Sequence, residues 1–301
     1  MEYFPNLPVG EFDQPGAWAK AKEAQGWHGI CASDHLFLGD HRYPHVFVTA
    51  MAMAGATERI TVTTSFANNL FRSPVEFAQA ALALQTFSGG RFEAGLGAGW
   101  AAAEMRAMGM PYPDGPTRVS LYVEALQIAA ALIHTGQCRF SGDHYRIDIA
   151  GDSAIGPTPA RPPLLIASAG GPRALREVTP LVDRVEIKAS ARGTRGGALD
   201  LATVATVTED EVKRNVERVK AIDAAKPLGI FLLVAAGQAP EVMALKGLFG
   251  NGYLGQFVGH PDEVARSLEN LASLGIDRVQ LTELAPGSHD ALAERLVDQL
   301  P

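Results

Sequence analysis

Short apolar runs alternate with longer helix-like segments along this chain, and this alternation is the strongest constraint on its fold. Several runs are rich in Ile, Val and Leu without alternating polar residues, which is typical of strands that are buried on both faces. Eight runs predict strands, at residues 2–5, 28–32, 60–66, 91–96, 164–168, 184–188, 229–235 and 278–282.

The segments between these runs carry helix start and stop signals. Ser73 precedes a proline at a first helical position, and Gly26 and Gly275 follow two predicted helix ends. The predicted helices span residues 15–25, 46–57, 74–87, 118–134, 172–181, 209–224, 241–248 and 261–274. Eight strand–helix units in 301 residues fit an α/β fold of the closed (β/α)8 type, a TIM barrel, better than an open sheet. Because no Pro/Ser-rich linker divides the chain, we expect residues 1–301 to form one barrel domain.

Two excursions interrupt the rhythm of strands and helices. Residues 135–163 follow the fourth strand and its helix, and residues 189–202 directly follow the sixth strand. Active sites of barrels lie at the carboxyl ends of the strands, which places the second excursion at that face. We expect both excursions, together with Phe37, His41 and Trp100, to form the substrate pocket.

Composition excludes several classes of protein. The formal net charge is −7 and no long basic run is present, which argues against nucleic acid or an anionic membrane surface as the main partner. Cys31 and Cys138 are too few and too far apart for a disulfide framework. No apolar run is long enough to span a bilayer, and Met1 is not followed by the pattern of a signal peptide. We therefore expect a cytoplasmic protein that acts on a small molecule.

Polar, small and glycine residues gather where four of the predicted strands end. In a barrel these ends meet at one rim, so we expect the residues to surround one site. They are Ser33, Asp34 and His35 after the second strand, Ser65, Phe66, Ala67 and Asn68 after the third, Gly97, Ala98, Gly99 and Trp100 after the fourth, and Ser168, Ala169, Gly170 and Gly171 after the fifth.

The Asp34–His35 pair is the best candidate for proton chemistry. Histidine titrates near neutral pH, and a hydrogen-bonded carboxylate can orient it. The plainer interpretation is that His35 ends a strand and bonds a backbone carbonyl. A third interpretation joins Asp34, His35, His41 and His45 into a metal site, but their spacing is not diagnostic of one.

The stretch Ser88-Gly89-Gly90-Arg91-Phe92-Glu93-Ala94-Gly95-Leu96-Gly97-Ala98-Gly99-Trp100 ends in glycines at alternate positions. Glycine lets the backbone approach another group closely, and such a strand end can hold a flat or phosphorylated ligand. The small residues 167–171 lead directly into a helix and would favour a phosphate, or they form a tight turn alone. Neither stretch matches the G-x-G-x-x-G dinucleotide motif.

Together these residues resemble the bacterial luciferase-like flavin and deazaflavin oxidoreductases, over almost the whole chain. The resemblance rests on the block 85–100 above all. Looser blocks that share it are Gly26-Trp27, Ala32-Ser33-Asp34-His35, 57–60, Ser73-Pro74, Glu104, 140–145, 161–171 and 259–264.

The resemblance implies a (β/α)8 barrel that binds reduced flavin or the 5-deazaflavin coenzyme F420 at the carboxyl ends of its strands. It implies that Ser33, Asp34 and His35 lie beside the coenzyme ring, with His35 as the acid or base. It implies a bulge, often with a non-proline cis peptide, at Ser65–Phe66. Gly97, Ala98, Gly99, Ala169, Gly170 and Gly171 would hold the ribityl chain and phosphate. A homodimer is implied as well.

This chain departs from two groups of the family, which narrows the range of activities that we expect. Sugar-phosphate dehydrogenases of this family place a glutamate soon after the strand-four glycines, where this chain has Trp100 and residues 101–103. The luciferases proper are longer. Our first hypothesis is hydride transfer between F420 and a small organic substrate, with His35, oriented by Asp34, moving the proton. The alternative is an FMN-dependent monooxygenase that uses oxygen and a separate reductase. Two further hypotheses are a flavin-binding barrel without turnover and a metal-dependent hydrolase.

Overall fold

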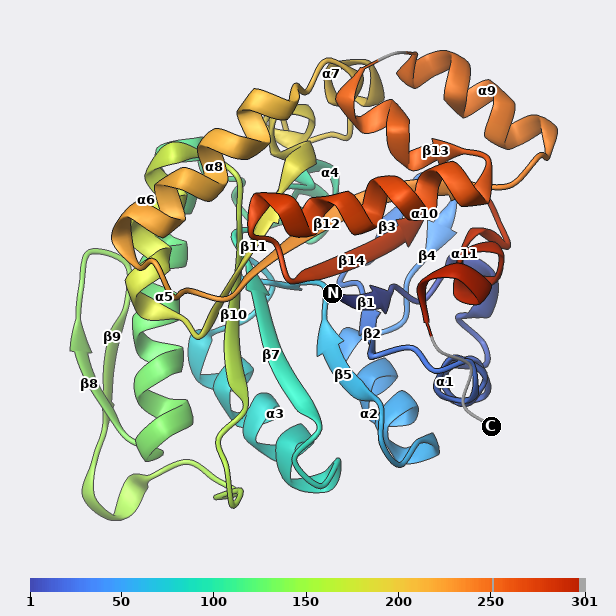
Figure 1. The fold of residues 1–301 in the computed structure, drawn as a ribbon. Helices are drawn as coiled ribbons and strands as arrows, with labels where there is room; N and C mark the ends of the chain where they lie inside the picture. Colours follow the sequence, from blue (N-terminus) through green and yellow to red (C-terminus); the bar gives the residue numbers. More distant parts are fainter. Residues whose placement is uncertain (251, 298–301) are drawn as a thin grey trace.

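The computed structural model describes residues 1–250 and 252–297, and its centre is a barrel of parallel strands (Figure 1). In the described residues the barrel strands follow the order of the chain, and each pairs in parallel with the next. They are β1 (Glu2–Pro5), β2 (Gly29–Ala32), β5 (Thr61–Thr64), β7 (Phe92–Gly97), β10 (Leu164–Ala169), β11 (Arg184–Lys188), β12 (Leu228–Ala236) and β14 (Arg278–Glu283). A parallel bridge between Asn6 and Cys31 joins the first strand to the second, so the ring closes. The predicted barrel is confirmed.

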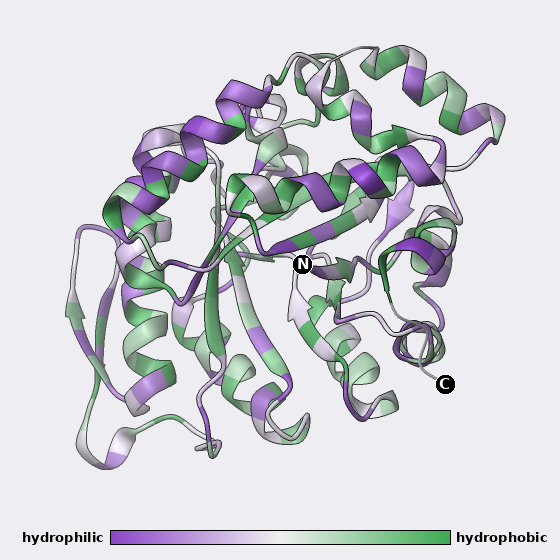
Figure 2. Cartoon of the chain, in the orientation of Figure 1, coloured by the Kyte–Doolittle hydropathy of each residue, from purple (hydrophilic) through white to green (hydrophobic). Residues whose placement is uncertain are grey.

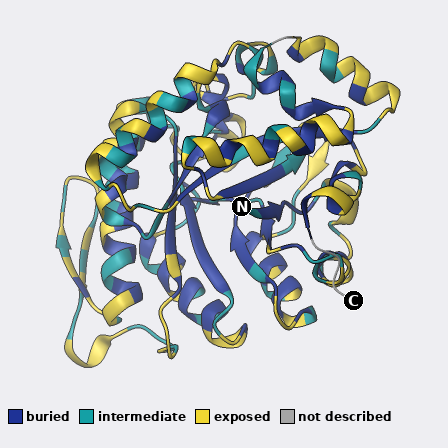
Figure 3. Cartoon of the chain, viewed as in Figure 1, coloured by how far each residue is buried: buried dark blue, intermediate teal, exposed yellow. Residues whose placement is uncertain are grey.

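Helices cover the outside of the barrel. They are α1 (Pro15–Ala24), α2 (Val46–Ala56), α3 (Pro74–Phe87), α5 (Gly115–Thr135), α6 (Pro172–Val178), α8 (Glu209–Ile222), α9 (Pro240–Phe249), α10 (Pro261–Asn270) and α11 (Ser288–Leu296). Figures 2 and 3 show helices such as α8 and α10 with hydrophilic, exposed residues outward, around strands that are buried. The Ser73 side chain accepts a hydrogen bond from the Glu76 N–H, as expected of a helix start. Helix α11 and the short helices α4 (Ala102–Ala107) and α7 (Leu201–Ala205) were not predicted.

The two excursions differ in structure. The first contains an antiparallel hairpin of β8 (Cys138–Ser141) and β9 (Arg146–Ile149), which lies beside α5 (Figure 1). The second is the 3-10 helix η4 (Ala189–Thr194), which leads on to α7. The remaining short strands are β3 (Phe37–Leu38), β4 (His41–Arg42), β6 (Ala67–Asn68) and β13 (Val258–Gly259). Across the described ranges, no helix combines the length and apolar character needed to cross a membrane.

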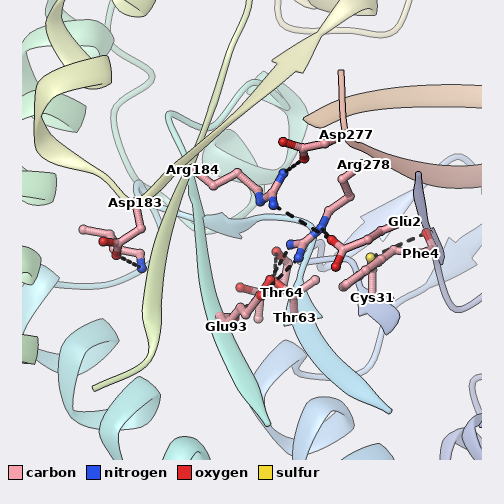
Figure 4. A network of polar contacts seen from close by, with 11 residues as sticks. Glu2, Phe4, Cys31, Thr63, Thr64, Glu93, Asp183, Arg184, Asp277 and Arg278 are labelled. Carbon is pink, nitrogen blue, oxygen red and sulfur yellow. Dashed lines mark hydrogen bonds and ion pairs between the residues drawn. The ribbon is translucent and has the colours of Figure 1, made fainter. Parts of the chain in front are cut away.

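A network of charged side chains fills the amino end of the barrel (Figure 4). The Arg278 guanidinium donates to both carboxylate oxygens of Glu93, and its Nε donates to Glu2 at 2.8 Å. Nearby, Arg184 pairs with Asp277. The network closes the end of the barrel that faces away from the strands' carboxyl ends, where β1, β7, β11 and β14 begin.

Glu186 adds an acid to this interior. It is fully buried, and a side chain at position 229 would collide with its carboxylate, which explains Gly229 on the neighbouring strand. Burial raises the pKa of Glu186 to about 7, although Arg278 and Arg184 act in the opposite direction. Since the folded protein then binds a proton that the unfolded chain has lost, Glu186 lowers stability as the pH rises from about 4.5 to about 7.

Substitution of Glu186 by Gln should remove this pH dependence. We expect the free energy of unfolding to fall less between pH 5 and pH 8 in Glu186→Gln than in the wild type, by up to about 3 kcal/mol. Urea unfolding at the two pH values measures the difference. The exposed Glu294→Gln variant is the control and should follow the wild type. Identical pH dependence in Glu186→Gln and wild type would show that Glu186 does not titrate in this range.

A candidate active site at the carboxyl ends of the strands

A cavity of about 520 Å³ opens at the carboxyl ends of the barrel strands. Every predicted site residue except Ala67 lines it, so the structure brings the four strand ends together as expected. Ala67 is instead fully buried and pairs with Leu96 of the neighbouring strand. Sequence reasoning missed a further set of lining residues, which are scattered along the chain and carry no motif: Leu38, Tyr43, Gly115, Pro116, Arg118, Val119, Tyr122, Pro172, Arg173, Ala174, Lys188, Phe231, Leu233 and Thr282.

The two excursions contribute unequally to this cavity. The excursion after β11 supplies several lining residues, including Ser190, Thr194 and Arg195. The hairpin of β8 and β9 supplies none of those described, because it packs beside α5. Phe37 and His41 were also expected to form the pocket, but Leu38 and Tyr43 of the same segment take that place. Of the residues and segments expected around the substrate, Trp100 and the second excursion line this cavity.

The third strand ends in the expected bulge. The Ser65–Phe66 peptide bond is cis, as the family resemblance implied. The glycines of β7 make room for this bulge: a Cβ at Gly95 would lie 2.0 Å from the Thr64 carbonyl oxygen, and one at Gly97 would lie 3.2 Å from the Phe66 Cβ. Gly99 has a φ of +78°, and a Cβ there would lie 2.4 Å from the Asn68 side-chain oxygen. The alternate glycines thus admit the neighbouring strand, and two of them also line the cavity.

His35 is held by a residue that the sequence interpretation placed in no role. Its Nδ1 lies 2.8 Å from a carboxylate oxygen of Glu104, which lies in the first turn of α4 and is 1% exposed. Glu104 also accepts hydrogen bonds from the Leu36 and Phe37 N–H groups. The edges of Tyr43 and Trp100 enclose the His35 ring, with centroids 5.2 and 5.4 Å away. A buried carboxylate that fixes one ring nitrogen leaves Nε2 for a ligand.

Asp34 does not orient His35, and that expectation is wrong. Its carboxylate accepts a hydrogen bond of 2.6 Å from the Asn68 N–H and forms a buried ion pair with Arg72. Adjacent residues at a strand end point in different directions, so Asp34 anchors the bulge while His35 turns to Glu104. The carboxylate that contacts His35 belongs instead to Glu104, which directly follows residues 101–103 beyond the strand-four glycines. The signal was present, since Glu104 was part of the family resemblance.

The residues of the proposed metal site do not converge. Asp34 is engaged by Arg72, and His41 and His45 are exposed. Over residues 1–250 and 252–297, no three His, Cys, Asp or Glu side chains lie close enough together to hold a metal ion. The hydrolase hypothesis has no support in this geometry.

Comparisons with known proteins place this site in a family context. Residues 5–194 match the family model described as luciferase-like monooxygenase. The F420-dependent glucose-6-phosphate dehydrogenase of Beutenbergia cavernae is 32% identical over 165 residues, which cover 53% of this chain and 48% of that protein. The chain thus spans about half the length of the first curated relatives that it matches. The FMNH2-dependent dimethylsulfone monooxygenase of Pseudomonas putida is 24% identical over 315 residues, covering 91% of this chain and 85% of that protein.

Solved structures share the architecture. An F420-dependent secondary alcohol dehydrogenase, in complex with an F420–acetone adduct, superposes with a TM-score of 0.75 and covers 99% of both chains at 19% sequence identity. At this identity the likeness shows the barrel fold alone.

The buried pair of Asp34 and Arg72 generates a prediction about stability. Asp34→Ala leaves the buried Arg72 guanidinium with the half-exposed Glu76 as its remaining carboxylate partner, and we expect it to lower the free energy of unfolding by about 3–5 kcal/mol. Asp148→Ala is the matched control, since Asp148 and Arg139 form an ion pair in which both side chains are exposed. Its cost should stay below about 1 kcal/mol. Equal losses in the two variants, measured by urea unfolding, would contradict the role of Asp34 as an anchor.

Proposed function

The chain belongs to the luciferase-like monooxygenase family, and on this premise we propose that it is an oxidoreductase that exchanges a hydride between coenzyme F420 and a small organic substrate. The observation that carries the proposal is that His35, on the wall of a cavity at the barrel rim, is paired with the buried Glu104. A histidine that a buried carboxylate holds can give or take the proton that must accompany a hydride. Relatives whose names include F420-dependent dehydrogenase support this coenzyme.

The cavity residues fit a flat heteroaromatic coenzyme. Ser65 lines the cavity, and its buried Oγ has no hydrogen-bond partner among the described residues, so a polar atom of a ligand could supply one. The apolar faces of Phe66 and Leu233 line the same space and suit a ring. The loops at 97–99 and 169–171 would hold the ribityl chain and phosphate. When bound, the deazaflavin supplies or accepts the hydride.

His35 performs the proton chemistry in this proposal. With Glu104 ionised, His35 carries its proton on Nδ1, and Nε2 is free to take a proton from a substrate hydroxyl. The same Glu104 carboxylate stabilises the imidazolium that results. In the opposite direction, imidazolium Nε2–H donates the proton to a substrate oxygen. Tyr43 and Trp100 keep the ring in place and limit the access of water to it.

The alternative function is an FMN-dependent monooxygenase fed by a separate reductase. It is favoured by the match to the dimethylsulfone monooxygenase, which extends over most of both proteins. The His35–Glu104 pair serves hydride exchange directly, so we rank the F420 reaction first.

Coenzyme binding distinguishes the two functions. We expect F420 to bind at micromolar concentration and oxidised FMN to bind at least tenfold more weakly. The protein is titrated into each coenzyme, and the change in coenzyme fluorescence gives the dissociation constant. Tighter binding of FMN would favour the monooxygenase, and the absence of binding by either coenzyme would reject both functions.

Substitutions at the pair test the proton role. His35→Ala should lower turnover by about 10²–10⁴-fold with little change in F420 affinity. Glu104→Gln keeps the shape of the side chain but removes the charge that stabilises the imidazolium, so we expect a smaller loss and an altered pH profile. Turnover is followed through the absorbance of oxidised F420 with a panel of small alcohols and aldehydes. Wild-type turnover in His35→Ala would remove His35 from the mechanism.

A further inference from the structure

Lys188 places a positive charge inside the candidate active site. It is the last residue of β11, is partly buried and lines the cavity beside Trp100. Its Nζ lies 5.2 Å from the centre of the Trp100 ring, and the same ring packs edge-on against His35. The ammonium and the proposed proton carrier therefore contact one tryptophan and share one wall of the cavity.

No described carboxylate neutralises this charge. Lys188 forms no ion pair or side-chain hydrogen bond within residues 1–250 and 252–297, and its ammonium lies over the Trp100 ring. The acids nearest the site are engaged elsewhere: Asp34 pairs with Arg72, and Glu104 accepts from His35 and two N–H groups. A cation that leaves water loses solvation free energy. Contact with an aromatic face restores part of this loss, but much less than an ion pair with an anion would restore.

The other cations of the cavity differ from Lys188. Arg118 stacks on Tyr112 and donates to the Pro113 carbonyl oxygen. Arg173 pairs with Glu177. Arg195 is exposed, so water solvates it. Lys188 alone among the cations lining the described cavity is both withdrawn from solvent and without an anionic or hydrogen-bonding partner, and burial lowers the pKa of its ammonium to about 8.

We propose that Lys188 binds the carboxylate of the substrate, so that the substrate of this site is a small organic monocarboxylate. The inference rests on the proposed oxidoreductase function and specifies its substrate class. One partly buried ammonium balances a single negative charge, whereas a phosphate dianion calls for several donors. Because Lys188 and His35 flank Trp100, a carboxylate on Lys188 would leave the rest of a small molecule within the cavity that His35 lines.

Matched acid and amide pairs test this proposal. Wild-type protein loaded with F420 is titrated by calorimetry with small carboxylates that carry a hydroxyl or carbonyl group, and with the primary amide of each. We expect at least one acid to bind roughly tenfold to hundredfold more tightly than its amide. Lys188→Met should abolish this preference, and Lys188→Arg should retain part of it. Lys20→Met, at an exposed lysine, should behave as the wild type.

Three outcomes would overturn the proposal. One is a wild-type protein that prefers no acid of the panel over its amide, and another is a preference that survives in Lys188→Met. The third is tighter binding of glucose 6-phosphate than of any carboxylate, which would make the substrate a phosphate. F420 affinity is measured separately for each variant. A loss of F420 binding in Lys188→Met with no change for the acids would assign Lys188 to the coenzyme, and a wild type that binds acids but no F420 would reject the proposed function alone.

Discussion

Closure of the parallel barrel is the constraint on which the rest of this structure depends. The bridge between Asn6 and Cys31 joins the first strand to the second, and every other barrel strand pairs with its neighbours in the chain. A closed parallel ring brings all carboxyl ends to one rim. His35, Phe66, Gly97, Gly170 and Lys188 are far apart in the sequence, but they surround one cavity because each follows or ends a strand of the same ring.

Buried polar groups lie both in the barrel interior and at its carboxyl end. Toward the amino end, Arg278 and Glu93 form a buried ion pair, whereas the carboxylate oxygens of the neighbouring Glu186 have no hydrogen-bond partner among the described residues. At the carboxyl end, the buried Ser65 Oγ has no hydrogen-bond partner among the described residues, and the partly buried Lys188 ammonium lies over the Trp100 ring. Buried polar groups without partners lower the stability of the fold. In a binding site, a ligand can supply the missing hydrogen bond or opposite charge.

The rim also shows how neighbouring residues divide their tasks. Asp34 holds the bulge after β5 through Asn68 and Arg72, whereas His35 turns to Glu104 on α4. The glycines of β7 make the bulge sterically feasible, since side chains at Gly95 or Gly99 would overlap it. The adjacent residues Asp34 and His35 therefore have separate roles. Asp34 anchors the bulge, and His35 forms with Glu104 a pair suited to proton transfer.

The sequence by itself determined the barrel and the four strand ends that form one part of the cavity wall, because buried parallel strands and helix caps are local patterns with a regular period. It also pointed to His35 and the Ser65–Phe66 bulge. It did not determine which carboxylate His35 contacts, that Ala67 is buried away from the cavity, or that Lys188 lies over Trp100. Glu104 follows His35 by a long stretch of chain, and Lys188 belongs to another strand. Such contacts depend on the packing of α4 and the strand ends in three dimensions, so only the tertiary structure decided them.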